Sequence, residues 1–445
     1  MITFVPEPHL LDSPRGRHWP HLPVPGVGTA PVPAAVDAVI VGGGPAGLAV
    51  ASALWHHGVE DVLVLDSADQ PCGRFFARID LLRQRILRSP YEHHPGVEGY
   101  RDCELLDFAR LHWSLLTPVE RREVRMAQAG HRSVVPVDVF EAYCRHIIAG
   151  HHVDERYRRA TVREVRPAAD AVTVRTDTFA VDARFVVLCT GEERRLAPRE
   201  WWGGGAPPPR VGYWDEPAAA GAGQLVVVGA GLTAAHLVTN ALAEGTRVHW
   251  VVREDVERYQ CADVNSSFFR PEGRARFGRV KWDDRLELMN RFRRASVMFE
   301  FRPRFQQAEA AGRLVVHRGR TVERVHDVPG DSAVVRLGDG EQVIGDRVAL
   351  AIGTAPSIGE GLLPEAAVAA RDGWPDLDDR TLAYRRAPRV FAVGAAAGMA
   401  LGPAARNIDG HRVATARVAA AVAAGLRDGC AAPIPGLPDQ VAAHV

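Results

Sequence analysis

The sequence predicts an α/β protein with two Rossmann-like dinucleotide-binding domains, the second of which is inserted into a discontinuous first domain. This prediction rests on a glycine-rich motif that occurs twice, as GGGPAG at 42–47 and GAGLTA at 229–234, each time directly after an apolar strand. Each motif opens a helical pattern that ends at a later glycine, Gly58 or Gly245, and a second apolar strand follows. One glycine motif is weak evidence for nucleotide binding, but two copies with matched internal spacing are far stronger.

The residues of each motif have distinct physical roles. The first glycine makes the tight turn from strand to helix, the second lets the backbone approach a pyrophosphate, and the third position packs the helix on the sheet. The N-terminus of the helix then faces the anion. We therefore expect cofactor contacts from the first motif at Gly42, Gly44, Pro45, Ala46 and Gly47, and from the second at Gly229, Gly231, Leu232 and Thr233.

The two copies differ at the end of their second strand. The first copy has Asp66, followed by Ser67, at the position where the second copy has Arg253. A carboxylate there accepts hydrogen bonds from ribose hydroxyls, whereas an arginine suits the 2′-phosphate of NADP. The pattern therefore predicts FAD in the first domain and NADPH in the second.

Composition limits the class of protein. The 445 residues are 47% hydrophobic and carry no formal net charge, which favours a globular chain with no whole-chain attraction to nucleic acid or to an anionic membrane. The six cysteines show no CxxC pair, and only Cys72 follows the first motif, so we expect neither a metal site nor a redox disulfide. Neither a signal peptide nor a transmembrane span is predicted, and the default location is cytoplasmic.

Five segments are expected along the chain. A proline-rich, extended and weakly ordered arm is expected over 1–34 and a tail over 431–445. Between them, the pattern predicts an FAD-binding part over 35–205, an NADPH-binding domain over 211–335, and a second FAD-binding part over 336–430. The boundary is placed at the GGGAPPP stretch of 203–209. Strands at 347–357 and 389–394 are expected to complete the first domain, and the strand 184–191 should end beside its cofactor, at Thr190 and Gly191.

The chain resembles flavoproteins with two dinucleotide-binding domains, over nearly its whole length after residue 35. Within that superfamily, three stretches are similar to the N-hydroxylating monooxygenases that act on lysine and ornithine. They are LLRQRILRSPYEHHPG at 81–96, RSVVPVDVFEAYCRHI at 132–147 and VNSSFFRPEG at 264–273. The lysine and asparagine pattern that binds substrate in the ornithine enzymes is not clearly reproduced.

This resemblance implies a monooxygenase that uses FAD, NADPH and O2. It would oxygenate a small nucleophilic metabolite, most readily by N-hydroxylation of an amine or amino acid through a flavin hydroperoxide. Gln84 is the candidate donor near the flavin ring, or else a solvent-facing glutamine, and Asn265 is the candidate substrate contact, or else the cap of a turn. Arg74 and Val162 are further candidates for cofactor contact.

One departure from the related flavoproteins concerns the flavin's ribityl chain. Many of them have a Gly-Asp pair late in the chain, but here Gly394 is followed by Ala395. The next helix, beginning around 407–410, could direct its positive end at the flavin carbonyl, with Asp409 near the cofactor. Asp409 is equally well explained as an ordinary helix cap.

Other functions remain open from the sequence. The chain could be a flavin reductase or dehydrogenase that passes electrons to a quinone or a protein acceptor. It could also be a flavin-bound sensor or assembly protein without turnover, or two Rossmann folds that have lost their nucleotides. The substrate atom and a possible homo-oligomeric state are not determined by the sequence.

Overall fold

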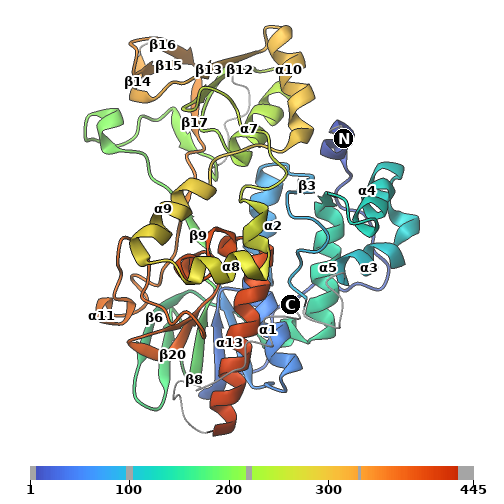
Figure 1. Ribbon diagram of the computed structural model, residues 1–445, viewed down its shortest axis with the longest axis vertical. Helices are drawn as coiled ribbons and strands as arrows, with labels where there is room; N and C mark the ends of the chain where they lie inside the picture. Colours follow the sequence, from blue (N-terminus) through green and yellow to red (C-terminus); the bar gives the residue numbers. More distant parts are fainter. Residues whose placement is uncertain (1–6, 97–103, 217–222, 329–331, 429–445) are drawn as a thin grey trace.

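The first unit of the computed structural model is built on an eight-stranded sheet with the order β19-β20-β8-β1-β2-β5, and β6 and β7 extend it beside β8 (Figure 1). Strands β20, β8, β1, β2 and β5 are parallel, as expected for strands joined by crossover helices. The structure describes residues 7–96, 104–216, 223–328 and 332–428. The expected tail at 431–445 lies outside these residues.

The elements of the first unit come from both ends of the chain. Its strands are β1 (Ala35–Val41), β2 (Val62–Asp66), β3 (Ile86–Leu87), β4 (Val135–Pro136), β5 (Tyr157–Arg159), β6 (Val162–Pro167), β7 (Val172–Thr176), β8 (Ala180–Leu188), β19 (Ala383–Tyr384) and β20 (Ala387–Ala392). Its helices are α1 (Pro45–His56), α2 (Gly73–Leu81), α3 (Glu104–Leu111), α4 (Pro118–Gln128), α5 (Val137–Gly150), α6 (Val153–Arg156), α11 (Glu365–Val368), α12 (Gly398–Leu401) and α13 (Ile408–Asp428). The prediction that 389–394 completes this sheet is confirmed, because β20 pairs with β8.

The second unit is a five-stranded parallel sheet with the order β10-β17-β11-β12-β13. Its strands are β10 (Val211–Tyr213), β11 (Gln224–Val228), β12 (Arg247–Val252), β13 (Leu314–Arg318) and β17 (Arg347–Leu350). Alternate residues of a strand point to opposite faces. Val227 accordingly packs with helices α7 (Leu232–Ala243) and α10 (Arg302–Ala310), whereas Val226 and Val228 pack against the antiparallel sheet of β14 (Val322–Val328), β15 (Ser332–Leu337) and β16 (Gln342–Gly345).

The predicted end of the NADPH-binding domain at residue 335 is wrong, because a later strand belongs to the same sheet. β17 lies between β10 and β11 of the second sheet, with Val226 opposite Val348, so the inserted unit continues to Leu350. The apolar pattern of this strand shows that it is buried in a parallel sheet, but it carries no information about which sheet.

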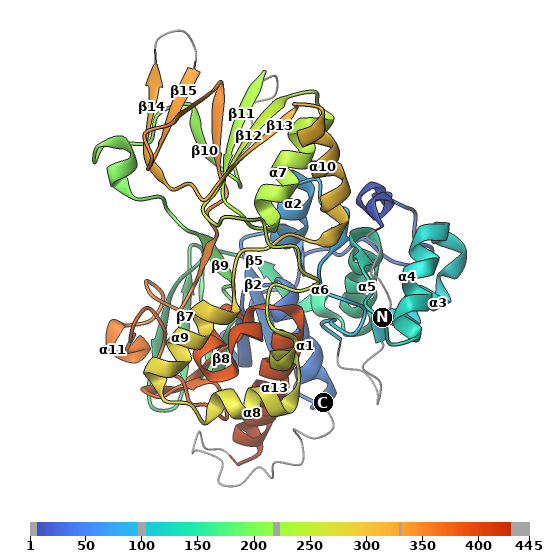
Figure 2. The same ribbon diagram turned by 45° about the horizontal axis from the view of Figure 1, so that its top comes forward.

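Two short segments join the units, and they pair with each other. β9 (Glu192–Arg194) leaves the first unit and β18 (Thr354–Pro356) returns to it, as an antiparallel ribbon. Helices α8 (Pro271–Gly278) and α9 (Trp282–Phe292) of the insertion fold back onto the first unit beside α13 (Figure 2). There Phe277 and Met289 share a hydrophobic cluster with Met399 and Ala404.

The N-terminal segment is packed rather than weakly ordered over residues 7–19. It contains a short 3-10 helix, η1 (Pro8–Asp12), and its Leu10, Leu11 and Trp19 are buried. The proline-rich composition that suggests disorder also suits a chain that packs without regular structure. None of the helices in the described parts of the chain combines the length and the apolar character that a membrane span needs.

Candidate functional site

The first glycine turn is internally tight at two positions and open at a third. Gly42 has φ +104°, and a Cβ atom there would lie 2.3 Å from the carbonyl oxygen of Cys189. A Cβ atom on Gly47 would lie 1.9 Å from the carbonyl oxygen of Gly42. In contrast, a Cβ atom on Gly44 would meet no described protein atom within 4 Å. Gly44 directly precedes α1 and lines a large cavity. The turn therefore leaves free the space at the N-terminus of α1 where an anion binds.

The second glycine turn has the same arrangement. Gly229 has φ +132°, and a Cβ atom there would lie 2.2 Å from the carbonyl oxygen of Ala351. Gly231 precedes α7 and lines the same cavity, and a Cβ atom there would meet none of the described residues within 4 Å. The third position of the motif, Ala234, is fully buried. Both turns thus present an open helix N-terminus to one cavity.

The acidic residue of the first unit is oriented by its own backbone. Asp66 ends β2, and its carboxylate accepts hydrogen bonds from the amides of Gly43 (2.6 Å) and Ala68 (2.9 Å). Each carboxylate oxygen retains capacity for a second donor, such as a ribose hydroxyl. Ser67 is exposed and also lines the cavity.

The basic residue of the second unit directly follows β12. Arg253 is exposed, lines the cavity and makes no ion pair within the described ranges of the chain. The neighbouring Arg320 also lines the cavity, but its guanidinium pairs with Asp339 (3.0 Å). Among the described residues at this strand end, Arg253 is therefore a cation that no carboxylate pairs with and that a phosphate could reach.

A single cavity of about 1780 Å³ connects the two turns. Pockets for one small molecule usually measure about 300–1,000 Å³, so this volume suits two large ligands side by side. The predicted residues that line it are Gly42, Gly44, Pro45, Ala46, Asp66, Ser67, Arg74, Gln84, Val162, Thr190, Gly191, Gly229, Gly231, Leu232, Thr233, Arg253 and Gly394. Gly47 does not line the cavity but lies behind the first turn, where the absence of a side chain lets α1 pack against Gly42.

Several of these side chains are held by other contacts. The Gln84 amide nitrogen donates to the carbonyl oxygen of Ile86 (2.8 Å), and the Thr190 hydroxyl donates to that of Ser357 (3.0 Å). The Arg74 guanidinium pairs with Glu193 (3.1 Å), and both side chains are exposed. The amide nitrogen of Gln84 is thus held at the cavity wall, and the residue is half-buried.

Two predicted site residues lie elsewhere. Asn265 is exposed outside the cavity lining, and its side-chain oxygen accepts from the amide of Ser267 (3.0 Å), which makes it the cap of a 3-10 turn. Asp409 is buried in the first turn of α13 and pairs with Arg274 (3.2 Å). In this arrangement a local cap and a buried ion pair use these two side chains, which favours the cap alternative for Asn265. Direct contacts from Asn265 and Asp409 stay predictions.

A charged cluster on the cavity wall was not predicted. Arg293 donates to Asp263 (2.7 Å) and to the side-chain oxygen of Asn407 (2.9 Å), and the Asn407 amide donates to Asp263 (3.0 Å). All three residues line the cavity. Burial alone would raise the pKa of Asp263, but the charges of Arg293 and Arg88 lower it overall. The three residues are far apart in sequence, so no local pattern reveals them.

A histidine on the same wall is held neutral. His411 lies one turn into α13, and burial lowers the pKa of its imidazole to about 4. A Cβ atom on Gly394 would lie 3.6 Å from its Nε2 atom. The wall near Gly394 therefore offers an uncharged imidazole at neutral pH, rather than the carboxylate that a Gly-Asp pair would supply.

Comparisons with known proteins agree with this geometry. Residues 40–95 match the profile of a family described as an NAD(P)-binding Rossmann-like domain. A search of curated protein sequences finds no match.

Solved structures resemble the whole chain. A reduced ornithine hydroxylase from Pseudomonas aeruginosa is 19% identical, with 88% of this chain and 100% of that chain aligned and a TM-score of 0.71. An FAD-bound cadaverine monooxygenase from Erwinia amylovora is 15% identical over 90% of this chain and 96% of that chain, with a TM-score of 0.67. A bacillithiol disulfide reductase from Staphylococcus aureus is 14% identical over 88% and 98%, with a TM-score of 0.57. The chain therefore has the two-unit fold that these amine hydroxylases and the disulfide reductase share.

Proposed function

We propose that the protein is an FAD-containing, NADPH-dependent monooxygenase that oxygenates a small nucleophilic metabolite. The observation that carries the proposal is the pair of open glycine turns, Gly44 and Gly231, which face one cavity from two different sheets. Asp66 beside the first turn suits the ribose of FAD, and Arg253 beside the second suits the 2′-phosphate of NADPH. The chain thus offers two different nucleotide sites that open into one cavity.

Bound together, the two cofactors would supply hydride transfer and oxygen activation, and the protein supplies position, electrostatics and exclusion of water. Asp263 and Arg293 neutralise each other on the cavity wall, and Asn407 fixes both. This cluster therefore presents oriented dipoles to the cavity without a net charge of its own. His411 holds no second proton at neutral pH, so it does not release one into the cavity when the pH changes near 7.

The monooxygenase proposal is favoured over thiol-disulfide chemistry by the cysteines. Cys189 is the one cysteine that lines the cavity among the described residues, and it has no second thiol there. Burial raises the pKa of the Cys189 thiol, which disfavours the reactive thiolate. The surroundings of Cys189 therefore do not suit a disulfide relay.

We propose N-hydroxylation of an amine or amino acid as the most specific form of this function. The support is the likeness in fold to an ornithine hydroxylase and a cadaverine monooxygenase, both of which act on amines. The substrate would enter the cavity between the two nucleotide sites.

The test is aerobic incubation with NADPH, 18O2 and a panel of amines and amino acids, read by mass spectrometry. We expect one labelled oxygen atom in a product and one NADPH consumed per product. Gly231→Ala is the matched control, because it should block NADPH and leave FAD bound. NADPH oxidation that reduces a quinone and never labels a product would establish a reductase. A flavin that NADPH does not bleach without oxygen would establish a protein without turnover.

A further inference from the structure

We infer that residues 7–19 form a strap that fixes the second unit on the first along residues 82–88, a segment called the seam below. Through the seam, the strap positions one wall of the cavity. In Figures 1 and 2 the blue N-terminal segment lies between α10 of the second unit and α4 of the first. The catalytic consequence of the strap rests on the proposed function, whereas its mechanical role does not.

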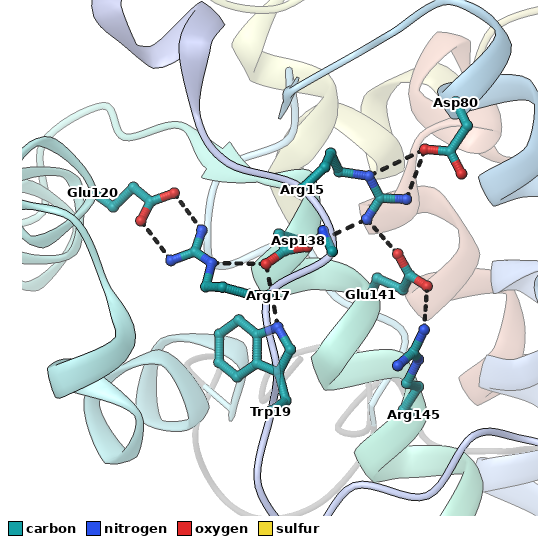
Figure 3. Close-up of polar contacts among 9 residues, drawn as sticks. Arg15, Arg17, Trp19, Asp80, Glu120, Asp138, Glu141 and Arg145 are labelled. Carbon is teal, nitrogen blue, oxygen red and sulfur yellow. Dashed lines mark hydrogen bonds and ion pairs between the residues drawn. The ribbon is translucent and has the colours of Figure 1, made fainter.

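Arg17 anchors the strap to the first unit. Its guanidinium donates to both oxygens of Glu120 (2.6 and 2.8 Å) and its Nε to Asp138 (2.7 Å), as Figure 3 shows. Glu120 and Asp138 are buried on α4 and α5. Burial alone would lower the pKa of Arg17, but its bonds and charge interactions with these two carboxylates raise it overall. Two buried carboxylates of the first unit thus depend on a cation that the strap supplies.

Arg15 and the residues beside it extend this anchor to α2. The Arg15 guanidinium pairs with Asp80 on α2 (2.8 Å) and with Glu141 on α5 (Figure 3). The amide of Gly16 and the indole nitrogen of Trp19 donate to Asp138 (2.8 and 3.3 Å). Because α2 ends at Leu81, this contact holds the element that leads directly into the seam.

The other end of the strap is anchored to the second unit. Leu10 and Leu11 are buried in a hydrophobic cluster. The same cluster contains Phe301, which directly precedes α10, and Phe305, which lies within α10. Arg304 on α10 donates to the carbonyl oxygen of Pro8 (3.1 Å) and pairs with Asp12. The strap therefore joins the two units by apolar contacts at one end and by ion pairs at both ends.

The seam lies between the strap and the cavity. Leu82 and Ile86 belong to the same cluster as Leu10, whereas Gln84, Leu87 and Arg88 line the cavity. The segment thus directs Leu82 and Ile86 to the cluster that it shares with the strap, and Gln84, Leu87 and Arg88 to the cavity.

Polar contacts tie the seam to the second unit. Arg88 donates to the carbonyl oxygens of Gln260 (2.9 Å) and Ser296 (3.2 Å), and the Asn240 amide donates to that of Leu82 (2.8 Å). Displacement of the second unit would therefore break contacts of Arg88 and alter the cavity wall.

The strap should consequently affect nucleotide binding at the second unit more than at the first. If loss of the strap leaves the correct arrangement of units only about a tenth of the time, the apparent dissociation constant for the nucleotide rises about tenfold. FAD should be retained, because Gly44 and Asp66 both lie in the first unit.

The test uses the full chain with two strap variants, the double variant Leu10→Ala/Leu11→Ala and the single variant Arg304→Ala. Both leave Arg15 and Arg17 in place to compensate the buried carboxylates. Arg336→Ala is the matched control for Arg304→Ala, because it removes an exposed ion pair with Glu323 (3.0 Å) far from the strap.

Hydrogen exchange measured by mass spectrometry is the first readout. We expect exchange about tenfold faster in peptides that cover 82–88 and 297–305, with β1 and β12 unchanged, and no change in Arg336→Ala. Unchanged exchange in 82–88 would overturn the strap. A uniform rise across all peptides would also overturn it, because the segment would then stabilise the whole fold rather than join the units.

Binding of NADP+ by calorimetry is the second readout. We expect about tenfold weaker binding in both strap variants and an unchanged FAD content. Equal NADP+ affinity in the variants and the wild type would overturn the positioning role. If the wild type binds no NADP+, the proposed function fails, and hydrogen exchange still decides whether the strap exists.

Discussion

Alanine at the two open glycines should separate the two nucleotide sites. Gly44 has φ −71° and Gly231 has φ −96°, both of which alanine adopts without strain. Because a Cβ atom meets none of the described residues within 4 Å at either position, neither methyl group clashes with the protein. Alanine restricts the unfolded chain, which stabilises by about 0.4–1 kcal/mol, and is a poorer helix cap, which costs a similar amount. We therefore expect stability within about 0.5 kcal/mol of wild type.

The same methyl group should prevent a pyrophosphate from reaching the helix N-terminus. A hydrogen bond to a charged group contributes about 1.5–3 kcal/mol, so loss of one such bond weakens nucleotide binding by about tenfold to a hundredfold. Gly44→Ala should lose FAD on purification. Gly231→Ala should keep FAD and lose NADP+ affinity.

The assay is the ratio of flavin to protein absorbance, together with NADP+ calorimetry and urea unfolding of each variant. Gly47→Ala is the contrasting variant, because its Cβ atom would lie 1.9 Å from the carbonyl oxygen of Gly42 and should impair folding itself. Wild-type flavin content in Gly44→Ala, or loss of both nucleotides in each variant, would refute the assignment of one nucleotide to each turn.

Three further predictions concern single side chains. Arg253→Ala should weaken the binding of NADPH by about tenfold and leave the binding of NADH nearly unchanged. Tenfold is the lower end for a charged contact, because the arginine is exposed. An equal loss of affinity for both nucleotides in steady-state kinetics would contradict a phosphate contact. Asn265→Ala should lower the free energy of unfolding by about 0.5–1 kcal/mol while KM for substrate stays constant, and Asn265→Asp should restore stability; a raised KM at unchanged stability would return Asn265 to the substrate site. Burial lowers the pKa of His236 to about 4. Below pH 6.5 the unfolded chain therefore binds a proton that the folded chain does not, and the free energy of unfolding decreases as the pH is lowered. His236→Leu should therefore remove about 2 kcal/mol of the loss between pH 7 and pH 5, as measured by urea unfolding, and an unchanged loss would show that His236 is not the group responsible.

The nucleotide turns were predictable because all their determinants are local. Strand, glycine turn, helix and second strand follow one another within about 30 residues, and the periodic patterns of the sequence describe each of them. The observed helices α1 and α7 accordingly end before Gly58 and Gly245, which have φ +74° and +82°.

The remaining features depend on contacts between distant parts of the chain. β17 has the apolar pattern of any buried parallel strand, so only the structure shows its neighbours. Asp263, Arg293 and Asn407 come together from three separate segments. Asn265 belongs to the expected loop, but its side chain is used by its own turn. Gln84 in the seam is predicted to lie near the cofactor, yet nothing in the pattern of the seam shows that an N-terminal strap supports it.

The pairing of β9 with β18 brings the two ends of the insertion close together. Arg194 lies opposite Thr354 in an antiparallel ribbon, so the chain leaves the first unit and re-enters it about 5 Å apart. A two-residue turn would span that gap and close the first unit as a hairpin without residues 195–353. The cost of such an excision would fall on two surfaces that the insertion covers. Met399 and Ala404 would be exposed beneath α8 and α9, and Leu10, Leu82 and Ile86 would be exposed beside α10. Any other unit with adjacent ends could occupy the same place on the first sheet.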